Sequence, residues 1–475
     1  MQNLNRREFL NLAAGGAAAV VIPSSGCQSE FASAGSAAKK RPNIIFIMVD
    51  DLGWADLGCY GSKAISTPNI DRMASEGIRF TDAYSGCMVC APARSVLMTG
   101  FHTGHTSVRS NTGGVPLEDS DITVAEVLKQ AGYRCGGFGK WGLGDVRTSG
   151  VPEKQGFDVF FGYYHQIHAH DYWTDYLWRN SEKIDMTGEK GSAERYTHYR
   201  IFEQTMDFIR QNKDRPFFCY APWTPPHGKF QIPEDEPVWA MYKDKEWPKD
   251  AKVAAAMDTM VDRHVGELLG LLKELGIDER TVVFFCSDNG AAFRFEGVLD
   301  SSGPLRGRKR DMYEGGIRVP MIVRWPGKIR AGQVSEHVWY FADVMPTLAE
   351  LAGAGKYVPG GIDGISVVPT LLGRAEEQKK HEYLYWEWHL YDWSKRENVP
   401  NGLMQAVRMG KWKAVRHRSD EAFELYDLEK DVGEENNLAG QHSGVMRKIE
   451  AYIKRTRVEP RPQIEPEMPE GKVFR

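Results

Sequence analysis

The sequence lacks the features that would place it in a specialised class of protein. Its 475 residues carry 60 Lys and Arg against 64 Asp and Glu, a formal net charge of −4. Because a nucleic-acid-binding protein normally carries a large excess of basic residues, this balance argues against nucleic acid as a partner. No repeat with a period of about 20 to 50 residues is visible. At 42% hydrophobic residues the composition excludes a disordered chain, and the length suffices for one large domain and a smaller one.

Long hydrophobic runs are also missing. The apolar run over residues 12–22 is too short to cross a bilayer, and it follows the pair Arg6-Arg7. This pattern predicts a twin-arginine signal peptide over residues 1–34, which ends at the cleavage pattern Ala32-Ser33-Ala34. Alternatively, Ser24-Ser25-Gly26-Cys27 loosely resembles a lipoprotein box, which would give Cys27 a lipid anchor. We therefore expect an exported protein, periplasmic or associated with the cell surface, with no transmembrane segment.

The seven cysteines show no compact disulfide spacing, so the sequence predicts no disulfide framework. Cys135, Cys219 and Cys286 fall in strand-like runs, where a cysteine acts as a small buried hydrophobe. Cys90 differs, because it lies at the start of a predicted helix that has Pro92 in its first turn.

Three interpretations of Cys90 follow from the residues around it. In the first, Cys90 is a structural cysteine. In the second, it forms a C-x-x-C redox or metal pair with Cys87. In the third, it is a reactive group at a helix N-terminus, where anions are favoured. No second C-x-x-C and no nearby His cluster completes a zinc site, and no thioredoxin-like context surrounds the pair.

Strand-like and helical segments alternate along most of the chain. Thr67-Pro68 supplies an N-cap and an N1 proline for one helix, and Thr123 with Glu126 forms a capping-box pattern for another. The alternation predicts an α/β fold with a largely parallel sheet that helices cover on both faces. The predicted strands cover residues 43–49, 216–221, 281–287 and 319–325, and the predicted helices cover residues 68–77, 90–100, 123–132 and 251–275.

The pattern changes near residue 380. Tyr- and Trp-rich strand-like runs cover residues 381–391, 405–416 and 425–427, and a closing helix is predicted near residues 445–455. We expect an α/β domain over residues 42–375, followed by a smaller α+β domain over residues 380–475.

Polar residues come directly after three of the predicted strands. They are Asp50-Asp51, His227 and Asp288-Asn289. The carboxyl edge of an open α/β sheet holds the active site, and carboxylate and amide oxygens suit Ca²⁺ or Mg²⁺. Each pair taken alone is also a common turn sequence that ends a strand.

These pairs belong to a longer series of motifs: Val49-Asp50-Asp51-Leu52-Gly53, Cys90-x-Pro92-x-Arg94 with Thr99-Gly100, Gly139-Lys140-Trp141, Pro225-Pro226-His227, Ser287-Asp288-Asn289-Gly290, Leu305-Arg306-Gly307-Arg308-Lys309, Tyr313-Glu314-Gly315-Gly316 and Leu425-Tyr426-Asp427-Leu428. With them the chain resembles the formylglycine-dependent (type I) sulfatases of the alkaline phosphatase superfamily, from about residue 42 to its end. The resemblance implies a large central mixed, mostly parallel sheet sandwiched by helices, with an antiparallel sheet in the smaller C-terminal domain.

The resemblance also implies an activity, that of a sulfuric ester hydrolase. Cys90 would be oxidised to formylglycine (3-oxoalanine) by a formylglycine-generating enzyme, and the hydrated aldehyde would supply the nucleophilic hydroxyl in place of the thiol. Asp50, Asp51, Asp288 and Asn289, together with the group at position 90, would hold Ca²⁺, with Mg²⁺ as the alternative.

The remaining motif residues would bind the sulfate group. By the same resemblance, Arg94 would lie beside the formylglycine, and Lys140 and Lys309 would donate hydrogen bonds to the sulfate. His227 would assist the leaving oxygen.

One position departs from the pattern of many relatives. Where they read Gly-Lys-Trp-His-Leu-Gly, this chain has Gly142 in place of the histidine that helps to deprotonate the intermediate. We hypothesise that His168 or His170, just downstream, supplies this base. Alternatively, Gly142 makes room for a bulkier substrate.

The expected substrate is a sulfated carbohydrate. Trp386-Glu387-Trp388-His389 resembles arrangements in carbohydrate sulfatases in which the C-terminal domain closes over the pocket, so Glu387 and His389 are candidate substrate contacts. Two alternatives stay open: a phosphate or phosphonate ester hydrolase of the same superfamily, and a non-catalytic glycan-binding protein.

Overall fold

The computed structural model describes residues 41–111, 115–392, 394–395 and 397–461. The predicted signal peptide over residues 1–34 and the lipid anchor at Cys27 lie outside these ranges and remain predictions. Within them, no helix combines the length and the apolar character needed to cross a membrane.

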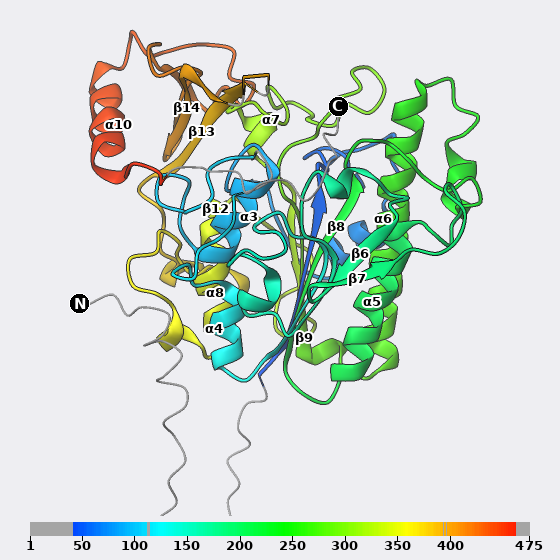
Figure 1. Cartoon of the computed structure of the whole chain (residues 1–475). Coiled ribbons are helices and arrows are strands. Elements are labelled where there is room, and N and C mark those ends of the chain that lie inside the picture. The colour runs from blue at the N-terminus through cyan, green and yellow to red at the C-terminus, as the bar shows by residue number, and fades with distance from the viewer. Residues whose placement is uncertain (1–40, 112–114, 393, 396, 462–475) are drawn as a thin grey trace, which may run out of the picture.

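A ten-stranded mixed sheet forms the centre of the molecule (Figure 1). Its strands are β1 (Asn43–Asp50), β2 (Ile78–Phe80), β4 (Arg134–Lys140), β5 (Val159–Tyr163), β6 (Tyr176–Arg179), β7 (Glu182–Asp185), β8 (Phe217–Pro226), β9 (Thr281–Ser287), β10 (Met321–Arg324) and β11 (Gln333–Ser335). They lie in the order β11-β2-β10-β9-β1-β8-β4-β5-β6-β7. The strands from β9 to β5 run parallel, and β10 and β6 join them antiparallel at the two ends. The predicted mostly parallel sheet is confirmed.

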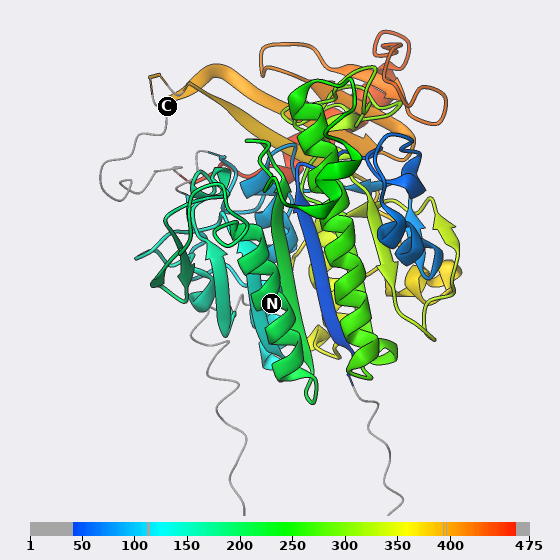
Figure 2. The ribbon, with the colours of Figure 1, turned by 90° about the vertical axis from the view of Figure 1, so that its right-hand side faces the viewer.

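Helices cover both faces of this sheet because its central strands are buried on both sides. In β1, Ile44, Phe46 and Met48 point into one hydrophobic core, and Ile45 and Ile47 point into the other. The first core is closed by α3 (Cys90–Thr99), α4 (Val124–Gln130) and α8 (Val344–Leu351), and the second by α2 (Pro68–Ser75), α5 (Thr197–Asn212) and α6 (Lys249–Glu274). Figure 2 looks onto the face that α5 and α6 cover. Shorter elements are α7 (Glu314–Ile317), α9 (Val368–Leu371), β3 (Ala83–Tyr84) and β12 (Trp339–Tyr340).

The helix ends follow the predicted capping chemistry with one exception. Thr123 and Glu126 form the expected capping box at α4, and Gly100 ends α3 in the left-handed region, at φ 75°. Pro68 begins α2, but the side chain of Thr67 does not cap that helix. Its hydroxyl instead accepts a hydrogen bond from the backbone N–H of Gly58.

The C-terminal segment forms a separate antiparallel sheet of four strands. They are β13 (Leu384–Asp392), β14 (Glu397–Met409), β15 (Trp412–Arg416) and β16 (Glu424–Asp427), with α10 (Ser443–Thr456) after them. The prediction of a single run over residues 405–416 is wrong, because Gly410, at φ 58°, turns the chain between β14 and β15. This sheet lies at the end of the molecule toward which the carboxyl end of β1 points (Figures 1 and 2).

The two sheets share a core. Trp386 of β13 packs with the residues of α3 and α8, whereas Tyr385 and Val407 on the opposite face pack with Ile449 of α10. The C-terminal sheet is therefore built onto the large sheet rather than tethered to it.

A buried ionic network joins the two parts. Lys413 of β15 is fully buried, and its ammonium lies 2.9 Å from a carboxylate oxygen of Glu314 and 3.1 Å from one of Glu434. Tyr84 donates a hydrogen bond to Glu314 at 2.6 Å. Although burial opposes ionisation, Lys413 and Arg318 lower the pKa of Glu314 to about 2, whereas burial raises the pKa of Glu434 to about 7.

We predict that Lys413→Met destabilises the protein by about 3 to 5 kcal/mol, because it leaves two carboxylates buried without their shared cation. Chemical denaturation followed by fluorescence measures this loss. Lys411→Met is the matched control: Lys411 pairs with Asp427 at 2.6 Å in the same sheet, but its side chain is 33% exposed. Equal losses in the two variants would show that the buried network does not join the two sheets.

Candidate active site

The carboxyl ends of three neighbouring strands bring the predicted polar pairs together. Strand β1 lies between β8 and β9 and is parallel to both, so Asp50-Asp51, His227 and Asp288-Asn289 follow at the same edge. The register of β1 against β8 shifts at the last pair, where Val49 lies opposite Trp223 but Asp50 lies opposite Pro226. This bulge places His227 beside the carboxylates of β1.

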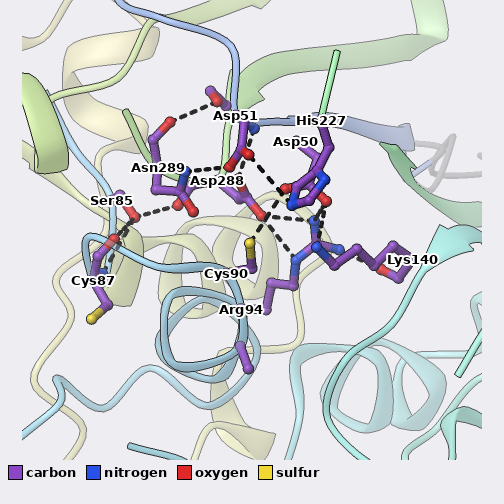
Figure 3. A network of polar contacts seen from close by, with 12 residues as sticks. Asp50, Asp51, Ser85, Cys87, Cys90, Arg94, Lys140, His227, Asp288 and Asn289 are labelled. Atoms are coloured by element: carbon purple, nitrogen blue, oxygen red, sulfur yellow. Dashed lines mark hydrogen bonds and ion pairs between the residues drawn. The ribbon is translucent and has the colours of Figure 1, made fainter. Parts of the chain in front are cut away.

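The acidic residues form one buried cluster (Figure 3). Ligand atoms of Asp50, Asp51, Cys90 and His227 all lie within 4.8 Å of one another. The side-chain amide of Asn289 donates to Asp51 Oδ1 at 2.7 Å, and the backbone N–H of Asp51 donates to Asp288 Oδ1 at 3.2 Å. Asp51 adopts φ 67°, a left-handed conformation that side chains other than glycine enter at a cost and that often marks functional sites.

Cys90 is the first residue of α3, and its sulfur faces this cluster. The Sγ atom lies 3.3 Å from Asp50 Oδ1 and 3.5 Å from the ammonium of Lys309. Burial, with Asp288 and Asp50 nearby, raises the pKa of the thiol well above its ordinary value. The thiol is therefore protonated at neutral pH and is a poor nucleophile as it stands.

The redox-pair interpretation of Cys90 finds no support in the structure. Cys87 is buried in the first hydrophobic core, and both cysteines are free. All six cysteines in the described ranges are free, in agreement with the prediction of no disulfide framework.

Three buried cations match the three carboxylates. Arg94 reaches Asp288 Oδ2 through Nε at 3.1 Å and Nη2 at 2.7 Å, lies 3.4 Å from Asp50, and donates to the carbonyl of Lys140. Lys140 donates to Asp50 Oδ2 at 2.6 Å, and Lys309 donates to both oxygens of Asp51 at 2.6 and 2.7 Å.

These pairings set the protonation of the cluster. Burial alone would raise the pKa of Asp50, but Lys140 and the neighbouring cations hold it well below its ordinary value. Burial and the charge of Asp50 raise the pKa of Asp288 to about 6. With three carboxylates against three cations, the cluster is close to neutral at pH 7.

The donor set fits Ca²⁺. Its oxygens come from carboxylates and an amide, the hard ligands that this ion prefers. Asn289 Oδ1 is buried and accepts no hydrogen bond from any residue that the structure describes. A divalent cation among Asp50, Asp51, Asp288 and Asn289 would use this oxygen and would change the cluster from neutral to about two positive charges, which suits an anionic substrate.

The structure separates the two histidines proposed to replace the one missing at Gly142. Both lie in a short 3₁₀ turn, His168–His170. The ring of His170 stacks on His227, with centroids 4.4 Å apart, whereas the Nε2 atom of His168 lies 2.7 Å from the hydroxyl of Thr174. Burial, with His227 and Lys140 nearby, lowers the pKa of His170 to about 2, so its ring is neutral.

The two candidate substrate contacts in the C-terminal sheet, Glu387 and His389, bond to residues outside the cluster. Glu387 is only 2% exposed, and its carboxylate pairs with Arg109 at 3.0 Å and with Arg457 at 2.7 Å. His389 is half-buried, and its Nδ1 atom lies 3.1 Å from the carbonyl of Leu390. Contact of either residue with substrate stays a prediction.

Sequence reasoning missed the close backbone contacts that support the site. A side chain at Gly290 would place its Cβ 1.9 Å from the carbonyl oxygen of Gly315, and the N–H of Gly290 donates to the carbonyl of Gly316 at 3.0 Å. The two glycine-containing motifs are thus in contact, and no pattern in the sequence indicated this contact. Gln166, also missed, lies beside Gly142, with its Oε1 atom 3.8 Å from where a Cβ at that position would lie.

A mixed sheet with an acidic cluster, a buried cysteine and three cations at its carboxyl edge suits a hydrolase that acts on anionic esters. Comparison with known proteins narrows this class. The family model described as Sulfatase matches residues 42–354, and the model for the C-terminal part of N-sulphoglucosamine sulphohydrolase matches residues 308–459. The chain belongs to the sulfatase family and is a sulfuric ester hydrolase.

Curated relatives and solved structures agree with this assignment. Human arylsulfatase A is 32% identical over 477 residues, which cover 89% of this chain and 88% of the relative. Human N-acetylgalactosamine-6-sulfatase is 34% identical over 364 residues, covering 71% of this chain and 67% of the relative. The crystal structure of Ps i-CgsB in complex with k-i-k-neocarrahexaose superposes with a TM-score of 0.75 at 28% identity, covering 89% of this chain and 94% of that chain.

We predict that Ca²⁺ raises the melting temperature of the protein by several degrees and that chelation reverses the shift, because an ion bound only by the folded state stabilises it. Asn289→Leu removes the buried oxygen and should lower the Ca²⁺-dependent shift by more than half. Differential scanning fluorimetry with elemental analysis of the purified protein measures both effects.

The control for this experiment is Asp363→Asn. Asp363 pairs with His105 at 2.9 Å in a second His-Asp group, outside the cluster described above. This variant should keep the full Ca²⁺ shift whatever its own stability. An undiminished shift in Asn289→Leu would exclude Asn289 as a ligand.

Proposed function

We propose that this enzyme removes sulfate from a sulfated carbohydrate with a formylglycine nucleophile made from Cys90 and a bound Ca²⁺. The position of Cys90 carries the proposal: its sulfur lies 3.3 Å from Asp50 and 3.5 Å from Lys309, in a setting that keeps the thiol protonated. A cysteine placed among catalytic groups but unfit to attack requires conversion into another nucleophile. The name of one relative, an N-acetylgalactosamine-6-sulfatase, and the k-i-k-neocarrahexaose bound in the structure of Ps i-CgsB support a carbohydrate substrate.

Each group of the cluster has one task in this proposal. The hydrated formylglycine at position 90 would supply the attacking hydroxyl, and Asp50, Asp51, Asp288 and Asn289 would hold the Ca²⁺, which would supply Lewis-acid activation of that hydroxyl and of the sulfate. Lys140 and Lys309 donate hydrogen bonds to the sulfate oxygens while charge shifts during transfer. His227 would assist the leaving sugar oxygen by donating a hydrogen bond to it, because burial lowers the pKa of its ring and keeps the ring neutral.

Arg94 has a positioning task. Its guanidinium holds Asp50, Asp288 and the backbone of Lys140 at once, so it fixes two acidic ligands and one sulfate-binding residue relative to α3.

The test of the proposal is the mass of the tryptic peptide that contains Cys90, from protein co-produced with a formylglycine-generating enzyme. We expect a loss of about 18 Da, from replacing CH₂–SH by an aldehyde, together with sulfate release from a panel of sulfated sugars. The panel includes 4-nitrophenyl sulfate, N-acetylgalactosamine 6-sulfate, a chondroitin 6-sulfate hexasaccharide and k-i-k-neocarrahexaose.

Cys90→Ala should lower kcat by at least about 10³-fold, whereas Cys87→Ala, which changes a buried cysteine of the neighbouring core, should retain turnover. An unmodified thiol at position 90 in fully active protein would refute the formylglycine proposal.

We further propose that His170 is the base that replaces the histidine absent at Gly142. Its ring stacks on His227 beside the cluster, with the two ring centroids 4.4 Å apart. The nearest alternative, His168, bonds Thr174 instead.

His170→Ala should lower kcat by about 10²- to 10⁴-fold with little change in KM, because a general base acts in the chemical step. Added imidazole should restore part of the rate, which a merely structural defect would not allow. His168→Ala is the control and should retain its rate. A drop in both variants without rescue by imidazole would reject His170 as the base.

A further inference from the structure

A cleft lies beside the cluster, and the sulfate chemistry does not use it. Its volume is about 540 Å³, within the range of small-ligand sites. The residues that line it come from two segments, 293–296 and 307–311: Phe293, Arg294, Phe295, Glu296, Gly307, Arg308 and Asp311.

Both segments continue directly from the catalytic cluster. Phe293 follows Asn289 by four positions, and Arg308 precedes Lys309. The backbone N–H of Lys309 donates to the carbonyl of Ala291 at 3.0 Å and so joins the two segments. Phe293 and Phe295 also line a small pocket that Asp51 reaches, so the cleft lies next to the cluster.

One wall of the cleft is an exposed aromatic platform. Phe293 is 48% exposed, although its ring packs on Phe230 at 5.5 Å and on Phe295 at 5.8 Å between centroids. A large aromatic ring that packs against other rings but remains partly exposed to solvent is typical of a binding surface. The flat apolar face of a sugar ring is a suitable partner for it.

The second segment contributes a positive charge beside this platform. The Arg308 guanidinium lies over the Phe293 ring, 5.9 Å from its centre, and no carboxylate pairs with it within the described ranges of the chain. Asp311 bonds the backbone N–H of Arg308 at 2.9 Å and so fixes the turn that presents this side chain. An exposed guanidinium suits a sulfate or carboxylate of a neighbouring sugar unit.

We propose that this cleft binds the sugar unit next to the one that loses its sulfate, with Phe293 stacking on its ring and Arg308 pairing with an anionic group on it. The inference rests on the proposed carbohydrate function and makes it more specific: the enzyme prefers an anionic oligosaccharide to a sulfated monosaccharide.

Two measurements test the inference. The first is binding of the chondroitin 6-sulfate hexasaccharide and of k-i-k-neocarrahexaose to a Cys90→Ser variant by calorimetry, which needs no turnover. At least one should bind, and Phe293→Ala and Arg308→Gln in that background should each weaken binding about tenfold, as loss of an anchoring side chain does. Arg308→Gln should also reduce the dependence of binding on salt.

The second measurement is the rate of sulfate release by the mature enzyme. Phe293→Ala and Arg308→Gln should raise KM for the bound hexasaccharide about tenfold and leave 4-nitrophenyl sulfate turnover unchanged, since that compound has no second sugar. Arg310→Gln and Val334→Ala are the matched controls: Arg310 is an exposed arginine of the same loop, Val334 is an exposed apolar residue on β11, and neither lines the cleft.

The outcomes separate the two proposals. Turnover of 4-nitrophenyl sulfate without binding of either hexasaccharide, or equal binding by all four variants, would overturn the cleft inference and leave the sulfatase chemistry intact. Hexasaccharide binding that depends on Phe293 and Arg308 would support the cleft even if the proposed nucleophile proved wrong.

Discussion

The need to neutralise buried charge governs this molecule. Asp50, Asp51 and Asp288 end two adjacent strands in the interior, where an unpaired carboxylate would cost several kcal/mol. The compensating cations come from α3, from the end of β4 and from the loop after β9. Segments that lie more than 200 residues apart in the chain are therefore held together by one balanced cluster, and the sequence motifs are the parts of this single electrostatic unit.

Close backbone packing supports the cluster from outside. Glycine is required where β4 meets β8, since a Cβ at Gly139 would lie 2.0 Å from the carbonyl oxygen of Pro222. The contact between Gly290 and Gly315 likewise ties the turn after β9, which carries the proposed metal ligands Asp288 and Asn289, to α7. Glu314, in the same helix, then bonds Lys413 of the C-terminal sheet. The short helix α7 thus connects the carboxyl edge of the large sheet to the C-terminal sheet.

The sequence predicted those features that depend on residues close together in the chain. Capping residues indicated helix ends, apolar runs located β1, β9 and the first half of β8, and the motifs identified the acidic pairs that the fold brings together. The predicted strand over residues 216–221 is too short, because β8 continues to Pro226. The strand-like run around Cys135 indicated β4 without its bounds, and β5 was not predicted, because glycines interrupt their apolar pattern. Gly136 of β4 leaves room for the ring of Phe208, a contact between distant segments. The choice between His168 and His170, and the burial of Glu387 between two arginines, depend on turn geometry and tertiary packing that no spacing encodes.

The residues proposed for the sulfate chemistry and those proposed for sugar binding differ in their exposure to solvent. Most of the groups proposed for the chemistry stand at strand ends or on the first turn of α3, where they are buried and bonded to one another. Lys309 lies on the loop after β9, where its bonds to Asp51 hold it in place. The groups proposed for sugar binding stand on the loops that leave those same strands, where Phe293 and Arg308 are open to solvent. A change of sugar preference then requires only a change in these loops. The buried charge balance opposes a comparable change in the cluster, because each carboxylate there is paired with a cation.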